Sequence, residues 1–108
     1  MAATRLGEKL NALRKKQGLT LEKLAEAGGM SKSYLWELEN KDSHRPSAEK
    51  LTALADVLGV TVAYFIEDDV REPEERHMDE NFYRNYLQLD PIAKEHLRRI
   101  LDTFKKEP

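Results

Sequence analysis

The segment GGMSKSYLWELENK, residues 28–41, holds the side chains best suited to contact another molecule. If residues 31–40 form one helix, a rotation of about 100° per residue places Leu35 and Leu38 on a single face. The opposite face then carries Ser33, Trp36, Glu37 and Asn40. A short helix has no structural need to hold a tryptophan against water. This second face is therefore predicted to bind a partner.

The residue types on this face suit duplex DNA. Lys32 can donate to guanine or to a phosphate, and Glu37 can accept from the cytosine amino group. The indole of Trp36 offers apolar area to a thymine methyl group and one N–H to a phosphate. Further predicted phosphate contacts are Lys41, His44 and Arg45 after the helix, and the helix starts at Thr20 and Ser47. Ser31, Ser33 and Asn40 are also predicted to bind DNA. The alternatives are that Trp36 covers a neighbouring loop and that Glu37 is a solvated charge.

Helical spacing of apolar residues organises the chain around this segment. It predicts one helix from Thr4 to Gln17, ended by Gly18, and a second one opened by Thr20. The glycine pair 28–29 separates the second helix from the third, and Asn40 is expected to end the third in the left-handed conformation. A fourth helix runs from residue 47 to Gly59, and a fifth from 61 to 66. Because no segment alternates like a strand, residues 1–66 are predicted to form an all-α, five-helix domain.

The remaining residues differ in charge and composition. Residues 1–66 carry 10 Lys and Arg against 8 Asp and Glu, whereas residues 67–108 carry 8 against 12, which together give the net charge of −2. Eight of the acids lie in residues 67–80, where few apolar side chains occur, so this segment is predicted to be a solvated linker.

Residues 81–108 are predicted to form a short C-terminal helical segment. Its last helix begins at Asp90–Pro91, where a cap is followed by a first-turn proline. An isolated helical hairpin of this size is unstable, so its apolar side chains need a partner surface. A second copy of the chain is favoured over packing on its own five-helix domain, because a two-fold dimer doubles the DNA site. The predicted dimerisation residues are Phe82, Tyr83, Tyr86, Leu97, Ile100, Leu101 and Phe104.

Two helices joined by a short glycine-containing turn form a helix-turn-helix. The stretch LRKKQGLTLEKLAEAGGMSKSYLWELENK, followed by RPSAEKLTALADVLGVTVAYFI, resembles the lambda repressor/Cro-like (Xre) helix-turn-helix family over residues 5–66. The resemblance implies a five-helix lambda-repressor-like domain whose third helix reads the major groove, and a homodimeric repressor bound to an inverted-repeat operator. It also implies a structural ion pair between Arg14 and Glu39. Leu21 stands where the family commonly has a DNA-gripping glutamine, so that contact is expected to be absent.

The tail adds a further resemblance. S-Y-x-W-E-L-E-N with a short FY…Y…LD…K…L end resembles regulators found beside ImmA/IrrE-like metallopeptidases, which implies such an enzyme as a partner.

Other interpretations of the function of the chain remain open. The chain is alternatively an antitoxin or a restriction–modification controller of the same fold, or a protein-interaction module that uses the same helix face.

Several classes of protein fit the sequence poorly. The histidines at 44, 77 and 96 lie in different segments, and H-E-x-x-H, C-x-x-C and phosphate-cradling glycine motifs are missing from the sequence. We therefore expect no catalytic residue, no metal site and no cofactor. Because the sequence lacks cysteine, a run of about 18 apolar residues and a secretory signal, a soluble cytoplasmic protein is expected.

Overall fold

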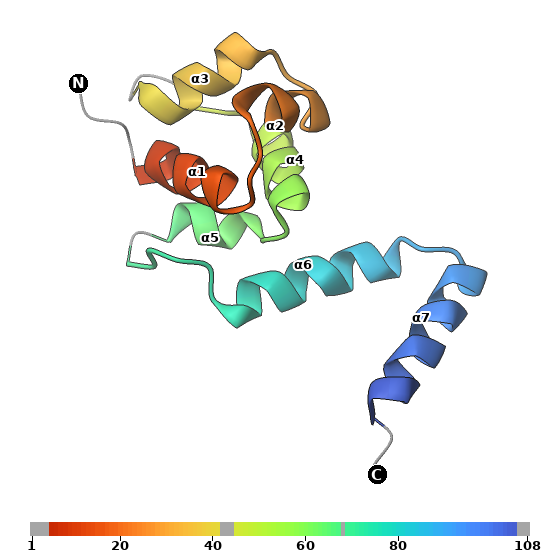
Figure 1. Cartoon of the computed structure of the whole chain (residues 1–108). Coiled ribbons are helices and arrows are strands. Elements are labelled where there is room, and N and C mark those ends of the chain that lie inside the picture. The colour runs from red at the N-terminus through yellow and green to blue at the C-terminus, as the bar shows by residue number, and fades with distance from the viewer. Residues whose placement is uncertain (1–4, 42–44, 68, 106–108) are drawn as a thin grey trace.

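The computed structural model describes residues 5–41, 45–67 and 69–105, and these residues form helices joined by short connections (Figure 1). The helices are α1 (Arg5–Lys16), α2 (Leu21–Ala27), α3 (Lys32–Asn40), α4 (Ala48–Leu58), α5 (Val62–Ile66), α6 (Glu75–Leu87) and α7 (Pro91–Lys105). The all-α class predicted from the sequence is confirmed. Thr4, where the first helix was expected to start, lies outside the described residues.

Helices α1–α5 enclose one apolar core. Leu10, Leu24, Leu35 and Leu54 are each 0% exposed and come from four different helices, and Tyr64 of α5 completes the core at 1%. Each helix buries one stripe of apolar residues, which is the pattern that the sequence predicted. Four of the predicted caps are confirmed: Thr20, Ser31, Ser47 and Asp90 each accept a hydrogen bond from the backbone N–H three residues on. Thr61 precedes α5, but its side chain makes no capping bond.

Gly7 allows α1 to cross α3 at close range. A Cβ atom at this position would lie 2.6 Å from the Glu39 carbonyl oxygen and 2.7 Å from that of Leu38. Both atoms belong to the backbone of α3, so they cannot rotate away. The absence of a side chain at Gly7 therefore allows α3 to pack closely on α1.

The Gly7→Ala variant is expected to be destabilised even though alanine favours helix formation by up to about 1 kcal/mol. Forcing α1 and α3 apart costs on the order of 1–3 kcal/mol or more, and we expect the melting temperature to fall by about 4 °C or more. Thermal unfolding followed by circular dichroism measures this, with Glu8→Ala on the exposed face of α1 as the control. A Gly7→Ala protein as stable as the parent would contradict the close crossing.

Two local expectations are corrected. Residues 67–80 are not a solvated linker throughout, because α6 begins at Glu75 and His77 is 0% exposed. Val70 is buried as well, at 9%. The acidic composition hid these contacts, which are made largely by polar side chains. The end of α3 also differs: Lys41 is its C-cap, with φ −121° and ψ 141°, and positive φ occurs among the described residues at glycines alone.

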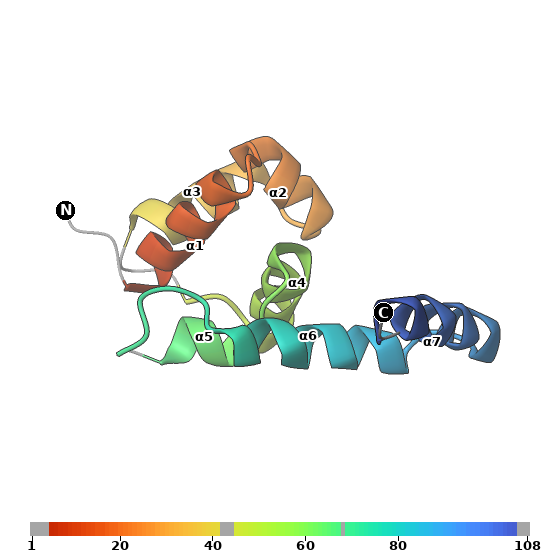
Figure 2. The ribbon, with the colours of Figure 1, turned by 60° about the horizontal axis from the view of Figure 1, so that its bottom comes forward.

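The last helix extends away from the five-helix domain. In both views α7 lies beyond the far end of α6 (Figures 1 and 2). It contains no buried residue, and its apolar side chains Ile92, Ile100 and Phe104 are 71%, 53% and 81% exposed. Within the described ranges, the helices are all too short or too polar to cross a bilayer.

Candidate nucleic-acid interface

The turn between α2 and α3 holds the two helices in a helix-turn-helix arrangement. Gly29 adopts φ +73°, a conformation that side-chain-bearing residues rarely take. The Met30 N–H then donates to the Ala25 carbonyl oxygen at 2.9 Å, which closes the end of α2. One residue later, the Ser31 hydroxyl caps the start of α3 by accepting the Tyr34 N–H at 3.0 Å.

The inner and outer faces of α3 divide as the sequence predicted. Leu35 and Leu38 are 0% and 1% exposed, whereas Trp36 is 46% exposed on the outer face. Trp36 therefore lies outside the apolar core. Lys32 and Ser33 are also exposed. A shallow surface hollow brings this face together with the start of α2, and it is lined by Leu21, Lys32, Ser33, Trp36 and Glu37.

The end of α3 carries a local charge arrangement. The Lys41 ammonium lies 3.9 Å from a Glu37 carboxylate oxygen and 5.9 Å from the centre of the Trp36 ring. Both contacts are long and solvent-accessible, so they leave Lys41 able to exchange them for a phosphate. Asn40 is exposed, and its side-chain amide donates one hydrogen bond to the Trp36 carbonyl oxygen at 2.8 Å.

The other candidate DNA contacts precede α2 or follow α3 in the chain. Arg45 is exposed, and Ser47 is the N-cap of α4, accepting the Lys50 N–H at 3.2 Å. Thr20 likewise accepts the Lys23 N–H at 3.0 Å at the start of α2. His44 lies outside the described residues.

A charged network supports α3 from behind. Arg14 of α1 forms a two-pronged contact with Glu39, with N–O distances of 2.8 and 3.0 Å. Asn11 also donates to Glu39, at 2.8 Å, and Arg14 donates to the Leu19 carbonyl oxygen at 3.0 Å. The Glu39 side chain is 1% exposed. The ion pair implied by the family resemblance is therefore present, and its network joins α1, α3 and the segment between α1 and α2.

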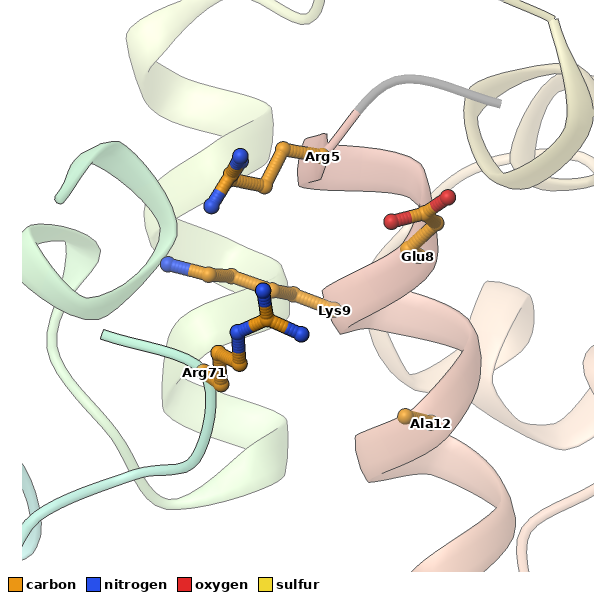
Figure 3. A pocket seen from close by; sticks show the side chains of 5 residues that line it. All are labelled: Arg5, Glu8, Lys9, Ala12 and Arg71. Atoms are coloured by element: carbon orange, nitrogen blue, oxygen red, sulfur yellow. The ribbon is translucent and has the colours of Figure 1, made fainter. Parts of the chain in front are cut away.

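A basic pocket lies away from α3, between α1 and the segment before α6. Figure 3 shows Arg5, Lys9 and Arg71 around it, from α1 and the segment before α6, with Glu8 and Ala12 completing the lining. The Lys9 ammonium donates to the Tyr64 carbonyl oxygen at 2.6 Å and lies 4.6 Å from the centre of its ring. The carbonyl oxygen of Glu67 also accepts from it. Lys9 thus joins α1 to the end of α5, a structural role.

Sequence reasoning missed the residues that fasten α6 to the domain. His77 and Asn81 are 0% and 7% exposed, and Arg84 pairs with Asp56 of α4. Their spacing of four and three residues places them on one helix face, a signal that a search for apolar stripes alone overlooks.

A tight turn and an outward-facing helix with basic and aromatic side chains define the helix-turn-helix class of DNA-binding protein. Comparison with known proteins places the chain in the same class. The helix-turn-helix family model matches residues 10–65, which is 56 of the 108 residues. The chain therefore belongs to the lambda repressor/Cro-like (Xre) helix-turn-helix family of transcriptional regulators.

Individual relatives match different extents of the chain. The immunity repressor protein of Bacillus phage phi105 is 35% identical over 71 residues, covering 66% of this chain and 49% of that protein. The transcriptional regulator SinR of Bacillus licheniformis is 29% identical over 103 residues, covering 93% and 92%. The chain is thus similar to SinR over most of its length and spans about half of the phage repressor.

SinR also supplies two similar solved structures. Its crystal structure in complex with DNA matches with a TM-score of 0.55 and 34% identity, covering 57% of this chain and 98% of that one. The SinR–SinI complex matches with a TM-score of 0.57 and 28% identity, covering 93% and 94%. Together with the family, these matches establish a DNA-binding transcriptional regulator of the repressor type.

Proposed function

We propose that this protein is a homodimeric repressor that binds an inverted-repeat operator through the outer face of α3. The observation that carries the proposal is the division of α3, which buries Leu35 and Leu38 and leaves Lys32, Ser33 and Trp36 exposed. The relative SinR has been solved in complex with DNA, and that match covers the part of the chain that contains this helix. Lys32 and Trp36 would contact bases, whereas Lys41, Arg45 and the caps of α2 and α4 would contact phosphates.

The dimer part of the proposal rests on the C-terminal helices. The apolar side chains of α7 contact no core in the single chain, and one recognition helix reads too few base pairs for useful specificity. A second copy, packed on the same face, would cover these side chains and present two copies of α3. SinR, which matches this chain across its tail, has been solved with the protein SinI, so a different protein on α7 is the competing arrangement. The metallopeptidase partner stays a prediction from the sequence.

In vitro selection from random duplex DNA tests the proposal directly. With the full-length protein we expect an enriched inverted repeat whose half-sites lie about one helical turn apart. Repeating the selection at a second salt concentration should show affinity falling steeply with salt, because phosphate contacts release counterions. Absence of enrichment and of binding, even at low salt, would overturn the DNA-binding role of α3.

Lys32→Ala and Trp36→Ala are each expected to weaken operator binding by about fivefold or more, since a lost base contact costs about 1–3 kcal/mol. Both side chains are exposed, so the melting temperature should stay within about 2 °C of the parent. Fluorescence anisotropy of labelled operator and thermal unfolding provide the two readouts. Lys15→Ala on α1 is the control and should bind normally. A large loss of stability in Trp36→Ala would reassign that residue to packing.

A further inference from the structure

Helix α6 presents two faces with different chemistry. At about 100° per residue, His77, Asn81 and Arg84 fall on one side and Phe82, Tyr83 and Tyr86 fall on the other. Helix α6 runs beneath α4 and α5 in Figure 1, and its first face contacts residues of α4 and residues that flank α5. The second face carries predicted dimerisation residues. A single helix therefore links the DNA-binding domain to the proposed dimer surface.

The middle of the polar face is anchored to α4. The Asn81 amide donates to the Val60 carbonyl oxygen at 3.0 Å and to the Asp56 carboxylate at 3.1 Å. The Arg84 guanidinium pairs with the same carboxylate oxygen. Asp56 lies in α4, so both contacts tie α6 to the helix that packs against α2.

The beginning of the polar face is anchored to α5 through His77. Its Nε2 lies 3.0 Å from a Glu67 carboxylate oxygen, and its Nδ1 accepts the Glu74 N–H at 2.9 Å. Because Nδ1 accepts, the ring proton resides on Nε2 and is donated to Glu67. The ring also meets Tyr64 edge-on, with centroids 5.4 Å apart. Hydrogen bonds from Arg76, and secondly from His77, lower the pKa of Glu67, which keeps this acceptor ionised.

The opposite face of α6 continues into the tail. Phe82 and Tyr83 are 62% and 60% exposed, and Tyr83 stacks on Tyr86 with centroids 6.4 Å apart. Lys94 and Arg98 of α7 lie over the Tyr86 ring at 5.5 and 5.8 Å, which joins the two tail helices. Any partner copy seated on this surface would thus be connected to α4 and α5 through α6.

We propose that the contacts of His77, Asn81 and Arg84 with Glu67, Val60 and Asp56 set the spacing between operator half-sites. These contacts, here called the α6 clasp, would fix the direction of the tail relative to α3 in each protomer, and hence the separation of the two recognition helices in the dimer. His77, Asn81 and Arg84 are positioning residues in this scheme. The inference rests on the proposed function, because it requires a DNA-bound dimer.

The dimensions make this effect measurable. Helix α6 has 13 residues, which corresponds to a length of about 20 Å. If the clasp opened and α6 swivelled by about 20°, its far end would move by about 7 Å, or about two base pairs at 3.4 Å each. The clasp consists largely of hydrogen bonds and one ion pair, so small substitutions can release it without removing the apolar core.

Selection for operator spacing tests the clasp from both sides. Asn81→Ala removes the two bonds that Asn81 makes to Val60 and Asp56, and Asp56→Ala removes the acceptor on α4 that Asn81 and Arg84 share, without changing the tail. The parent should enrich one half-site spacing, whereas both variants should enrich the same half-site sequence with spacings spread over two base pairs or more. Glu80→Ala, at an exposed position of α6, is the matched control and should keep the parental spacing. Sedimentation should show dimers for all four proteins.

A distance measurement extends the test to the free dimer. The chain has no cysteine, so Glu26→Cys on α2 provides one spin-label site per protomer. Electron–electron resonance should give one narrow inter-protomer distance for the parent and a broadened distribution for Asn81→Ala and Asp56→Ala. A single unchanged spacing and a narrow distance in both variants would overturn the clasp proposal, as would a broad distance in the parent. A monomeric parent, or one that enriches no inverted repeat, would instead contradict the proposed function.

Discussion

The double variant Ile100→Asp/Leu101→Asp is expected to sediment as a monomer and to bind operator at least about 100-fold more weakly. Two linked binding sites gain a factor of about 10²–10⁴ over one, and this gain disappears when the link is lost. Ile100 and Leu101 are 53% and 56% exposed in the single chain. Carboxylates placed there would have to be desolvated on association, which opposes pairing.

The control for this variant lies on the adjacent polar face of α7. Arg99→Asp changes the net charge by the same two units, but Arg99 is exposed and pairs with Glu95 along the helix. It should remain dimeric and bind operator with affinity close to that of the parent. Analytical ultracentrifugation and anisotropy provide the measurements. A double variant that still sediments as a dimer would move the dimer surface away from α7.

The Glu39→Ala variant is expected to lose about 3–5 kcal/mol of stability, because removal of one partner leaves the Arg14 charge unpaired in a largely buried position. The Arg14 side chain is 11% exposed and that of Glu39 is 1% exposed. Asn11 would lose its acceptor at the same time. Denaturant unfolding monitored by circular dichroism measures the loss.

A double variant that removes both charges separates the effect of the ion pair from that of packing. Arg14→Met/Glu39→Met should be less destabilised than Glu39→Ala, since neither buried charge remains. Glu37→Ala, two residues earlier and towards the outer side of α3, should cost below about 1 kcal/mol. Equal losses for Glu39→Ala and Glu37→Ala would show that the charge network does not stabilise the fold.

The recognition helix could be predicted because its information is local. The spacing of Leu35 and Leu38 determines which side of α3 is buried, and Trp36 follows from that geometry alone. The same holds for the caps at Ser31 and Ser47, whose hydrogen bonds span three residues. Periodicity and cap chemistry act within one helical turn, so a single sequence reveals them.

The attachment of α6 could not be predicted in the same way. Asn81 bonds to Asp56 and Val60, which precede it by 25 and 21 residues, and His77 bonds to Glu67. Polar contacts over such separations leave no apolar stripe, and the acidic neighbours of His77 indicate solvent. Gly7 did carry a signal, since a glycine inside a helix favours close backbone approach, but its partner on α3 depends on tertiary packing.

The position of Trp36 has an optical consequence. It is the single tryptophan of the chain, and it lies half-exposed on α3 beneath the Lys41 ammonium. Indole emission, excited where tyrosine hardly absorbs, therefore originates from one known point on the outer face of α3. The protein carries a built-in fluorophore there, and its emission reports on that surface without an added dye.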